Sequence, residues 1–256
     1  MSLPKQIRSS IFISMTILGG ISTVLSIAGI SLGDCEKLKF WMRIAVVIVV
    51  YVVIYIAVYN SIGLIFRNSV SIIIRQTSVS VGCGDIFKAS GLRVIGCDTH
   101  FDTRVDDVVI SRGSLHGQLL LDHGDKEDII TVVESEAKRL GLQKNSNGLY
   151  DFPLGTIIRY DSKVDNQTYL MLAMTELNSD YEAHTSMAKY EQMLMKMWGE
   201  ISRVYAGNDI YFPILGAGIT RFDDGPEGKE SLLRCMLCTL NSSGVSFNAK
   251  VSVLIY

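Results

Sequence analysis

The chain has 256 residues, of which 48% are hydrophobic and 20% are charged, and its mean hydropathy is +0.28. This composition is too apolar for a disordered chain or an ordinary soluble domain and too charged for a bundle of membrane helices, so we expect two different parts. The 24 Lys and Arg residues are balanced by 26 Asp and Glu residues, which leaves a net charge of −2. That balance argues against nucleic acid as a partner, because nucleic-acid-binding proteins normally carry a basic surface.

Two long apolar segments lie near the N-terminus, at residues 10–32 and 44–66. Neither contains Asp, Glu, Lys, Arg or His, and each has about the 20 residues that a helix needs to cross a bilayer. A cleavable signal peptide is the alternative for the first segment, but the segment exceeds the usual apolar core of about 7–15 residues and a second one follows it. We therefore predict a two-helix transmembrane hairpin over residues 1–68, which makes the chain a multi-pass membrane protein.

The connection between the two segments, residues 33–43, is short and charged, so both termini are expected on the same side of the membrane. Basic residues at the outer ends, which include Lys5, Arg8 and Arg67, slightly outnumber those of the connection, and this favours cytoplasmic termini. The five cysteines form no dense disulfide pattern, which also fits a reducing compartment. Small residues in the first segment, such as Gly19 and Gly29, favour close helix pairing and self-association into a homo-oligomer.

Residues 69–256 alternate between short β-type runs and amphipathic helices, which predicts an α/β domain with a mixed sheet sandwiched by helices. A helix is expected at Asp125–Leu140, because acidic residues open it and Lys138, Arg139 and Gly141 close it. A longer helix, Glu182–Tyr205, would place Tyr190 and Met197 on one apolar face, and a third helix is expected at Glu230–Leu240. The expected strands are Val70–Arg75, Leu92–Gly96, Gly155–Tyr160, Tyr169–Thr175, Ile210–Ile214 and Val251–Ile255.

Three segments that follow β-type runs are candidates for binding an anion or a nucleotide. In residues 212–222, Gly216-Ala217-Gly218 follows a strand, and glycines there would let consecutive N–H groups approach a phosphate; a simple tight turn is the alternative. A second loop, residues 110–117, offers Gly113, Ser114 and Gly117. In the third segment, residues 84–87, Asp85 comes directly after a strand end.

Several side chains could in principle catalyse a reaction or bind a metal. His100 and His116 are possible acid–base residues near an acidic cluster, Asp98, Asp102, Asp106 and Asp107, although these aspartates could equally cap turns. No nucleophile is evident. Cys235 and Cys238 form a Cys-x-x-Cys pair, but no second pair completes a zinc site, so neither a metal nor a catalytic residue is predicted.

The order of these motifs resembles that of macro domains, which bind ADP-ribose. Gly84-Asp85-Ile86, a central glycine-bearing loop and the late run from Pro213 to Ile219 carry the resemblance. Together with the two N-terminal segments and the run Phe101–Gly117, they make the chain similar to the TM-macro effectors (ThsA) of type II Thoeris anti-phage defence. The Asn-Ala-Ala-Asn sequence of hydrolytic macro domains is replaced here by a different stretch, residues 96–102, which favours a sensor over an enzyme.

The resemblance implies roles for particular residues. Asp85 would accept a hydrogen bond from the adenine amino group beside Ile86, the loop around Gly216 would hold the diphosphate through N–H groups, and Phe222 would pack on the distal ribose. The loop 114–117 would form the other wall. The implied ligand-binding residues are Asp85, Ile86, Gly113, Ser114, Leu115, His116, Gly117, Gly216, Ala217, Gly218, Ile219, Thr220 and Phe222.

The resemblance also implies a function. The chain would be an effector in the bacterial inner membrane whose cytoplasmic domain senses an ADP-ribose derivative, such as an amino-acid conjugate made by a partner TIR-domain protein. Binding would trigger oligomerisation and membrane disruption, without any cofactor. A membrane-anchored ADP-ribosyl hydrolase and an ADP-ribose reader remain the alternatives.

Overall fold

The computed structural model describes residues 15–17, 19, 48–59, 69–178, 182–225 and 227–255. The chain divides into two compact units, Met1–Asn68 and Ser69–Tyr256. In the first unit, all of the described residues are helical. Among the residues described there and in the second unit, no helix is both long and apolar enough to span a bilayer. The predicted spans, residues 10–32 and 44–66, fall largely outside the described residues.

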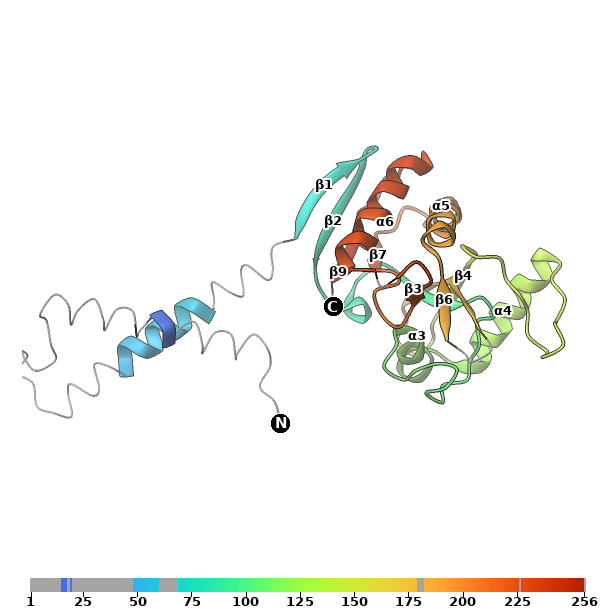
Figure 1. Cartoon of the computed structure of the whole chain (residues 1–256), viewed down its shortest axis with the longest axis horizontal. Helices are drawn as coiled ribbons and strands as arrows, with labels where there is room; N and C mark the ends of the chain where they lie inside the picture. The colour runs from blue at the N-terminus through green and yellow to red at the C-terminus, as the bar shows by residue number, and fades with distance from the viewer. Residues whose placement is uncertain are drawn as a thin grey trace, which may run out of the picture. The chain divides into compact units, whose positions relative to one another are not determined.

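The second unit is built on a mixed nine-stranded sheet (Figure 1). Five strands run parallel in the order β2 (Thr77–Cys83), β9 (Val251–Ile255), β7 (Ile210–Pro213), β3 (Leu92–Asp98) and β5 (Thr168–Leu177). Two antiparallel strands flank them: β1 (Val70–Ile74) pairs with β2, and β4 (Ile157–Asp161) pairs with β5. The short strands β6 (Ala183–Thr185) and β8 (Arg221–Phe222) extend the sheet from the end of β5.

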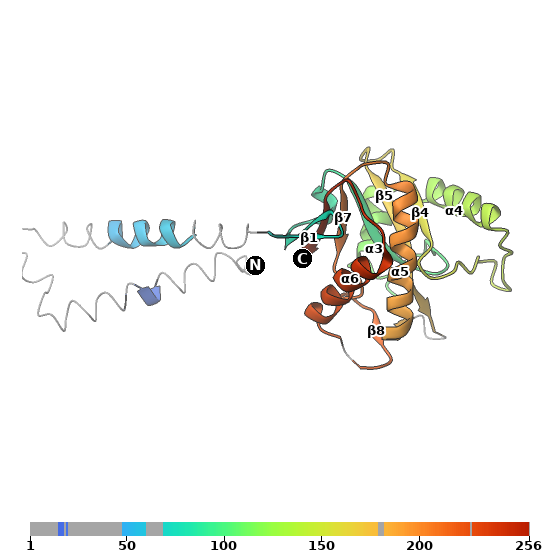
Figure 2. The same cartoon turned by 90° about the horizontal axis from the view of Figure 1, so that it is seen from above.

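Helices cover both faces of this sheet, which gives an α/β/α sandwich (Figures 1 and 2). On one face, α5 (Met187–Val204) lies beside α6 (Lys229–Ser243), and on the other lie α3 (Leu115–Gln118) and α4 (Lys126–Leu140). Short helical turns, η2 (Ile86–Lys88) and η3 (Leu119–His123), complete the second layer. Alternate residues of the central strands supply two separate cores, because side chains of a strand point to opposite faces. Leu170 and Leu172 face α5, whereas Tyr169 and Met171 face α4.

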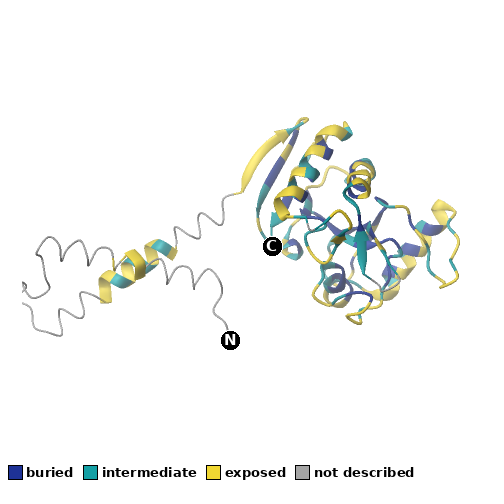
Figure 3. Cartoon of the chain, in the orientation of Figure 1, coloured by how far each residue is buried: buried dark blue, intermediate teal, exposed yellow. Residues whose placement is uncertain are grey.

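Burial of both faces explains why the sequence of the central strands is almost continuously apolar. Figure 3 shows the interior strands as buried, while the edge strand β1 is exposed along most of its length. The α/β sandwich expected from the alternation of elements is therefore confirmed.

The helix α4 begins and ends as the sequence predicts. Asp125 caps it by accepting hydrogen bonds from the backbone N–H groups of Glu127 and Asp128, and Gly141 ends it in the left-handed conformation with φ of 69°. Capping at the first turn satisfies donors that have no partner inside the helix, and glycine adopts the left-handed region without strain.

Three features of the sequence prediction are wrong. The long helix begins at Met187 rather than Glu182, because Ala183–Thr185 pairs with β5 and β8, and Ser186 caps the helix. The expected strand ranges leave out β2, although a strand end is expected before Asp85; the buried Ser80 hydroxyl of β2 bonds to that of Ser252 at 3.0 Å. The residues before Ile110 form bends rather than a β-type run, as described below.

Trp198, in α5, is the largest side chain of the core between α5 and the sheet. Its replacement tests how this helix packs. Trp198 is 1% exposed, its ring lies 5.1 Å from that of Phe212, and its indole N–H donates to the Thr239 hydroxyl at 3.2 Å. We predict that Trp198→Ala lowers the free energy of unfolding by about 3–5 kcal/mol, because it removes buried area and leaves a cavity. Denaturant unfolding measures this loss.

Met195 on the same helix is the matched control. Its side chain is 40% exposed, so Met195→Ala should change the free energy of unfolding by no more than about 0.5 kcal/mol. Equal effects of the two substitutions would contradict the assigned orientation of α5.

Candidate functional site

A cavity with a volume of about 510 Å³ lies at one edge of the sheet. It is lined by the last residues of β3 and β5, the loop after β7, the end of β9 and the loop that leads into α3. Parallel strands present their carboxyl ends at a common edge, and ligands of open α/β sheets bind in the crevice outside those ends.

The spacing of β3 and β7 creates the opening. These strands are hydrogen-bonded only near their beginnings, through the pairs Leu92–Ile210 and Arg93–Tyr211. Past these pairs, the cavity is lined by residues of both strands, Gly96–Asp98 on one side and Pro213 on the other. Strands that end at the same edge but stop pairing leave room for a ligand between them.

The glycine loop after β7 forms one wall and is anchored at its start. The Tyr190 hydroxyl donates to the carbonyl of Leu215 at 2.9 Å. Gly216 has a φ of 79°, and a Cβ there would lie 3.2 Å from the ring of Phe222. By contrast, a Cβ on Gly218 would meet nothing within 4 Å. The loop is therefore fixed at residues 215–216 and open to the cavity at Gly218.

The open part of this loop can serve an anion. No hydrogen bond to a described protein group uses the backbone N–H of Gly218 or Ile219, and the Ile219 side chain is exposed. Successive N–H groups in a glycine-rich turn form a concave site for phosphate oxygens. Lys229, the first residue of α6, also lines the cavity and is the one Lys or Arg among its lining residues.

The opposite wall is the loop before α3, and its residues are held by one another. The Ser114 hydroxyl caps α3 by accepting from the N–H of Gly117 at 3.0 Å and donates to the carbonyl of Ser111 at 2.7 Å. A Cβ on Gly117 would lie 2.2 Å from that same carbonyl oxygen. Gly117 therefore shapes this wall by allowing close backbone approach rather than by lining the cavity.

A buried acid–histidine pair forms part of the cavity lining. Asp98 ends β3, His116 lies in α3, and 3.9 Å separates the Asp98 carboxylate from His116 Nδ1. Both side chains are less than 8% exposed. Burial lowers the pKa of His116, although the nearby carboxylates of Asp98 and Asp102 oppose the shift. His116 is therefore a neutral imidazole that can donate or accept a hydrogen bond in the cavity.

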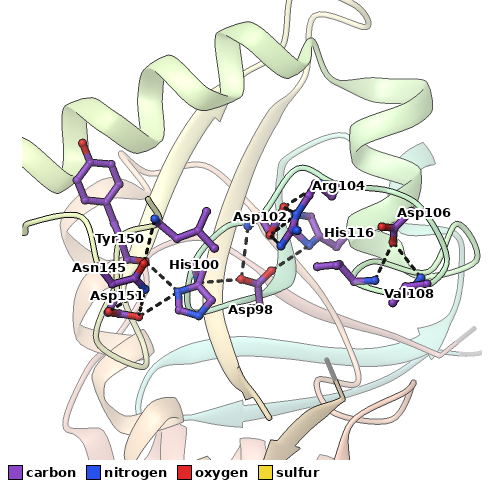
Figure 4. Close-up of polar contacts among 12 residues, drawn as sticks. Asp98, His100, Asp102, Arg104, Asp106, Val108, His116, Asn145, Tyr150 and Asp151 are labelled. Carbon is purple, nitrogen blue, oxygen red and sulfur yellow. Dashed lines mark hydrogen bonds and ion pairs between the residues drawn. The ribbon is translucent and has the colours of Figure 1, made fainter. Parts of the chain in front are cut away.

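His100 lies on the other side of Asp98, as Figure 4 shows, and does not line the cavity. Its Nδ1 is 3.1 Å from the carbonyl oxygen of Tyr150 and 3.1 Å from the carboxylate of Asp151. The backbone N–H of His100 donates to Asp98 at 2.8 Å, which orients that carboxylate. Of the two histidines considered as acid–base residues, only His116 lines the cavity.

The remaining aspartates of the acidic cluster stabilise the loop between β3 and α3. Asp102 is buried and forms a bidentate pair with Arg104; although burial opposes ionisation, these bonds hold its pKa below the ordinary value. Asp106 accepts from the N–H groups of Val108 and Val109, and Asp107 from that of Arg112 (Figure 4 shows the Asp106 turn). Turn-forming aspartates explain why this stretch contains bends instead of a strand.

Asp85 lies at the same edge but not among the cavity-lining residues. Its carboxylate accepts from the backbone N–H of Phe87 at 3.0 Å and lies 3.3 Å from the ammonium group of Lys88. The preceding Gly84 is close to the cavity wall, because its Cβ position lies 3.0 Å from the side chain of Leu254. Leu254 itself lines the cavity.

The structure brings together most of the residues named from the sequence. Four of the predicted residues do not line the cavity: Asp85, Ile86, Gly117 and Phe222. Of these, Ile86 is buried in the core below α4. The predicted residues that line the cavity are Gly113, Ser114, Leu115, His116, Gly216, Ala217, Gly218, Ile219 and Thr220.

Further lining residues were not expected from the sequence. Met174, Thr175 and Leu254 end strands, and Lys229 begins a helix. A common position at the carboxyl ends of β5 and β9 is the signal that could have identified the first three. Among the described residues, no group of His, Cys, Asp and Glu side chains is arranged to hold a metal ion.

Comparison with known proteins agrees with this architecture. The model of the family described as "Thoeris protein ThsA, Macro domain" matches residues 79–256. The Thoeris protein ThsA of Bacillus amyloliquefaciens (strain Y2) is 28% identical over 258 residues, which cover 97% of this chain and 84% of that protein.

Solved structures share the fold at low identity. The Oceanobacillus iheyensis macrodomain with ADP has a TM-score of 0.52 and 14% identity, over 74% of this chain and 88% of that one. The same macrodomain with MES bound has a TM-score of 0.51 and 14% identity, over 74% of this chain and 89% of that one.

The depressed pKa of His116 predicts how stability depends on pH. A buried neutral histidine binds fewer protons than it does in the unfolded chain, where its pKa is near 6.5. The free energy of unfolding should therefore fall as the pH drops through about 6.5. Replacing His116 by Gln removes this contribution, so unfolding measured between about pH 7.5 and 5.5 should show a flatter profile for the variant. Identical profiles would mean that His116 is not held neutral.

The two glycines of the α3 loop give a matched pair of variants. Gly117→Ala forces a methyl group against the Ser111 carbonyl and should lower the free energy of unfolding by about 1–3 kcal/mol. Gly113→Ala should fold like the parent, since its nearest contact would be 3.8 Å away. Thermal unfolding with hydrogen exchange over residues 111–118 measures both effects. A stable, unaltered Gly117→Ala protein would show that this wall is placed incorrectly.

Proposed function

The chain belongs to the Thoeris ThsA macro-domain family, and we propose that it is a membrane-anchored effector that senses an ADP-ribose-containing signal nucleotide. The observation that carries the proposal is the cavity at the carboxyl edge of the sheet, with an open glycine loop on one side. The macrodomain of similar fold has ADP in its structure, which supports a nucleoside diphosphate as the common part of the ligand.

We assign parts of the ligand to parts of the cavity by their chemistry. The diphosphate would lie on the N–H groups near Gly218, with Lys229 supplying a positive charge. Adenine would reach Asp85, whose carboxylate is partly exposed and can accept a hydrogen bond from the exocyclic amino group. The distal ribose would then lie between Phe222 and the loop 114–117.

Membrane anchoring is supported by the character of the first unit. Residues 48–59 form a helix without charged residues, and its apolar side chains are exposed, with Val49 and Val53 each at 60%. A helix that exposes apolar side chains is stable where lipid surrounds it. We propose that this unit places the protein in the bacterial inner membrane, with the ligand-binding unit in the cytoplasm.

Signalling requires that the ligand favour one state of the protein. A ligand shifts an assembly equilibrium only if it binds the assembled form more tightly than the separate chains. We propose that an ADP-ribose derivative made by a partner TIR-domain protein supplies this difference and drives homo-oligomerisation, and that the assembled membrane segments disrupt the bilayer.

The Asp98–His116 pair favours one alternative specifically. A neutral histidine beside a carboxylate could act as a general base, which makes an ADP-ribosyl hydrolase the second candidate. Burial raises the pKa of the Cys97 thiol in the lining, and the Ser114 hydroxyl donates to a backbone carbonyl. Neither group is an activated nucleophile, so we favour binding without turnover. A reader that only localises modified proteins would bind ADP-ribose without either turnover or membrane damage.

One experiment separates these functions. The purified full chain, reconstituted in vesicles that contain a self-quenched dye, is titrated with ADP-ribose conjugates while dye release and nucleotide composition are followed. The effector proposal predicts dye release with the nucleotide unchanged. Conversion of the nucleotide would establish the hydrolase, and saturable binding without release or turnover would establish the reader.

The position of Gly218 gives a pair of variants that tests the cavity. Gly218→Ala should bind ligand like the parent, because its Cβ position is open. Gly218→Glu should lower affinity at least about a hundredfold, since it fills the anion site and sets a carboxylate against the diphosphate. Calorimetry with ADP-ribose measures this difference, and parental affinity of the Glu variant would place the diphosphate elsewhere.

A further inference from the structure

A group of aromatic and charged residues packs behind the loop that carries Asp85. The ring of Phe87, two residues after Asp85, is stacked on the imidazole of His123 in η3, with centroids 4.2 Å apart and an angle of 5° between the planes. Neither ring belongs to the lining of the cavity between β3 and β7. Such parallel stacking restricts the Phe87 side chain and thereby the backbone of the short turn η2.

His123 is itself held by the turn between β4 and β5. Its Nδ1 is 3.0 Å from the carboxylate of Asp165, and the same carboxylate oxygen accepts a hydrogen bond from the Tyr169 hydroxyl at 2.6 Å. Tyr169 is fully buried. Hydrogen bonds from Tyr169 and His123 outweigh the effect of burial and lower the pKa of Asp165, so the carboxylate stays charged and fixes the imidazole plane.

Arg93 holds the end of η2, the short turn that follows Asp85. Its guanidinium donates through Nη2 to the carbonyl of Ala89, directly after η2, and lies over the Tyr169 ring with Cζ 5.4 Å from the centroid. Arg93 is 3% exposed, and its Nε is the one buried side-chain nitrogen or oxygen without a partner in the described part of the chain. A guanidinium is buried at considerable cost, so its position behind η2 points to a specific structural role.

These contacts fix the residues 85–89 at three points. Asp85 caps η2 through the N–H of Phe87, Phe87 stacks on His123, and Ala89 is held by Arg93. The Asp85 carboxylate cannot move independently of Phe87, because the two are joined by a hydrogen bond within the turn. A change at His123 would therefore be transmitted to Asp85 without any contact with the ligand.

We propose that His123 is a positioning residue that sets the selectivity of the cavity for adenine by holding Phe87, and through it Asp85, in place. This inference rests on the proposed function, in which Asp85 accepts a hydrogen bond from the adenine amino group. It adds that this selectivity depends on a stack and a hydrogen bond that lie outside the cavity. Affinity for the diphosphate, which the loop around Gly218 would provide, should be independent of His123.

The test compares ADP with inosine diphosphate, which lacks the exocyclic amino group, and with inorganic pyrophosphate. Calorimetry on the purified full chain should show that the parent prefers ADP about tenfold, the size expected for one hydrogen bond to a charged acceptor. His123→Ala should reduce this preference to less than about twofold and leave pyrophosphate affinity unchanged. His123→Phe keeps a flat ring against Phe87 and should restore a preference of at least about fivefold.

His100→Ala is the matched control. His100 has a similar exposure, 21% against 25%, and a similar contact with an aspartate, at 3.1 Å against 3.0 Å, but it lies away from η2. This variant should keep the parental preference, and thermal unfolding should show that all variants are folded.

The outcomes separate the inference from the proposed function. The inference is overturned if His123→Ala keeps the parental preference while Asp85→Ala loses it, or if His123→Ala weakens pyrophosphate binding as much as ADP binding. If the parent binds none of the three probes, the proposed function fails first. Loss of preference in His123→Ala with rescue by Phe would establish the positioning role.

Discussion

The incomplete pairing of β3 with β7 is the constraint on which the site depends. All five parallel strands end at one edge of the sheet, but β3 and β7 share hydrogen bonds at only two pairs near their beginnings. Beyond those pairs β3 continues to pair with β5 and β7 with β9, but β3 and β7 separate from each other, and each then leads into a loop. One of these loops is the glycine turn around Gly216 and the other is the long aspartate-rich loop between β3 and α3, and the cavity lies between them.

The two walls meet this requirement in different ways. In the aspartate-rich loop, the carboxylates of Asp106 and Asp107 accept hydrogen bonds from backbone N–H groups of the same loop, which stabilises it without secondary structure. In the glycine loop, no described protein group accepts a hydrogen bond from the N–H of Gly218 or Ile219, and Tyr190 and Phe222 hold the first residues of the loop. One wall therefore uses its N–H groups for hydrogen bonds within the loop, and the other has two N–H groups that no described protein group uses. That difference is what a site for an anionic ligand requires.

Much of this arrangement could be predicted from the sequence, for identifiable reasons. Helix α4 was predictable because Asp125 and Gly141 are strong local signals at its ends, and the central strands because both of their faces are apolar. The glycine loop was recognisable because Gly216 and Gly218 follow a strand. Local sequence carries no comparable signal for the pairing of β6 with β8 or for the stack of Phe87 on His123, since both join residues more than 30 positions apart. The cavity-lining role of Lys229 was hidden for the same reason, because only the folded sheet places α6 beside the strand ends.

The central claim is that the cavity between β3 and β7 holds the diphosphate of an ADP-ribose derivative. A structure of the full chain determined with bound ADP-ribose tests this claim most directly. The account predicts diphosphate oxygens within hydrogen-bond distance of the backbone N–H groups of Gly218 and Ile219, with adenine at Asp85. A ligand bound elsewhere, or bound in this cavity with its diphosphate away from the glycine loop, would contradict it.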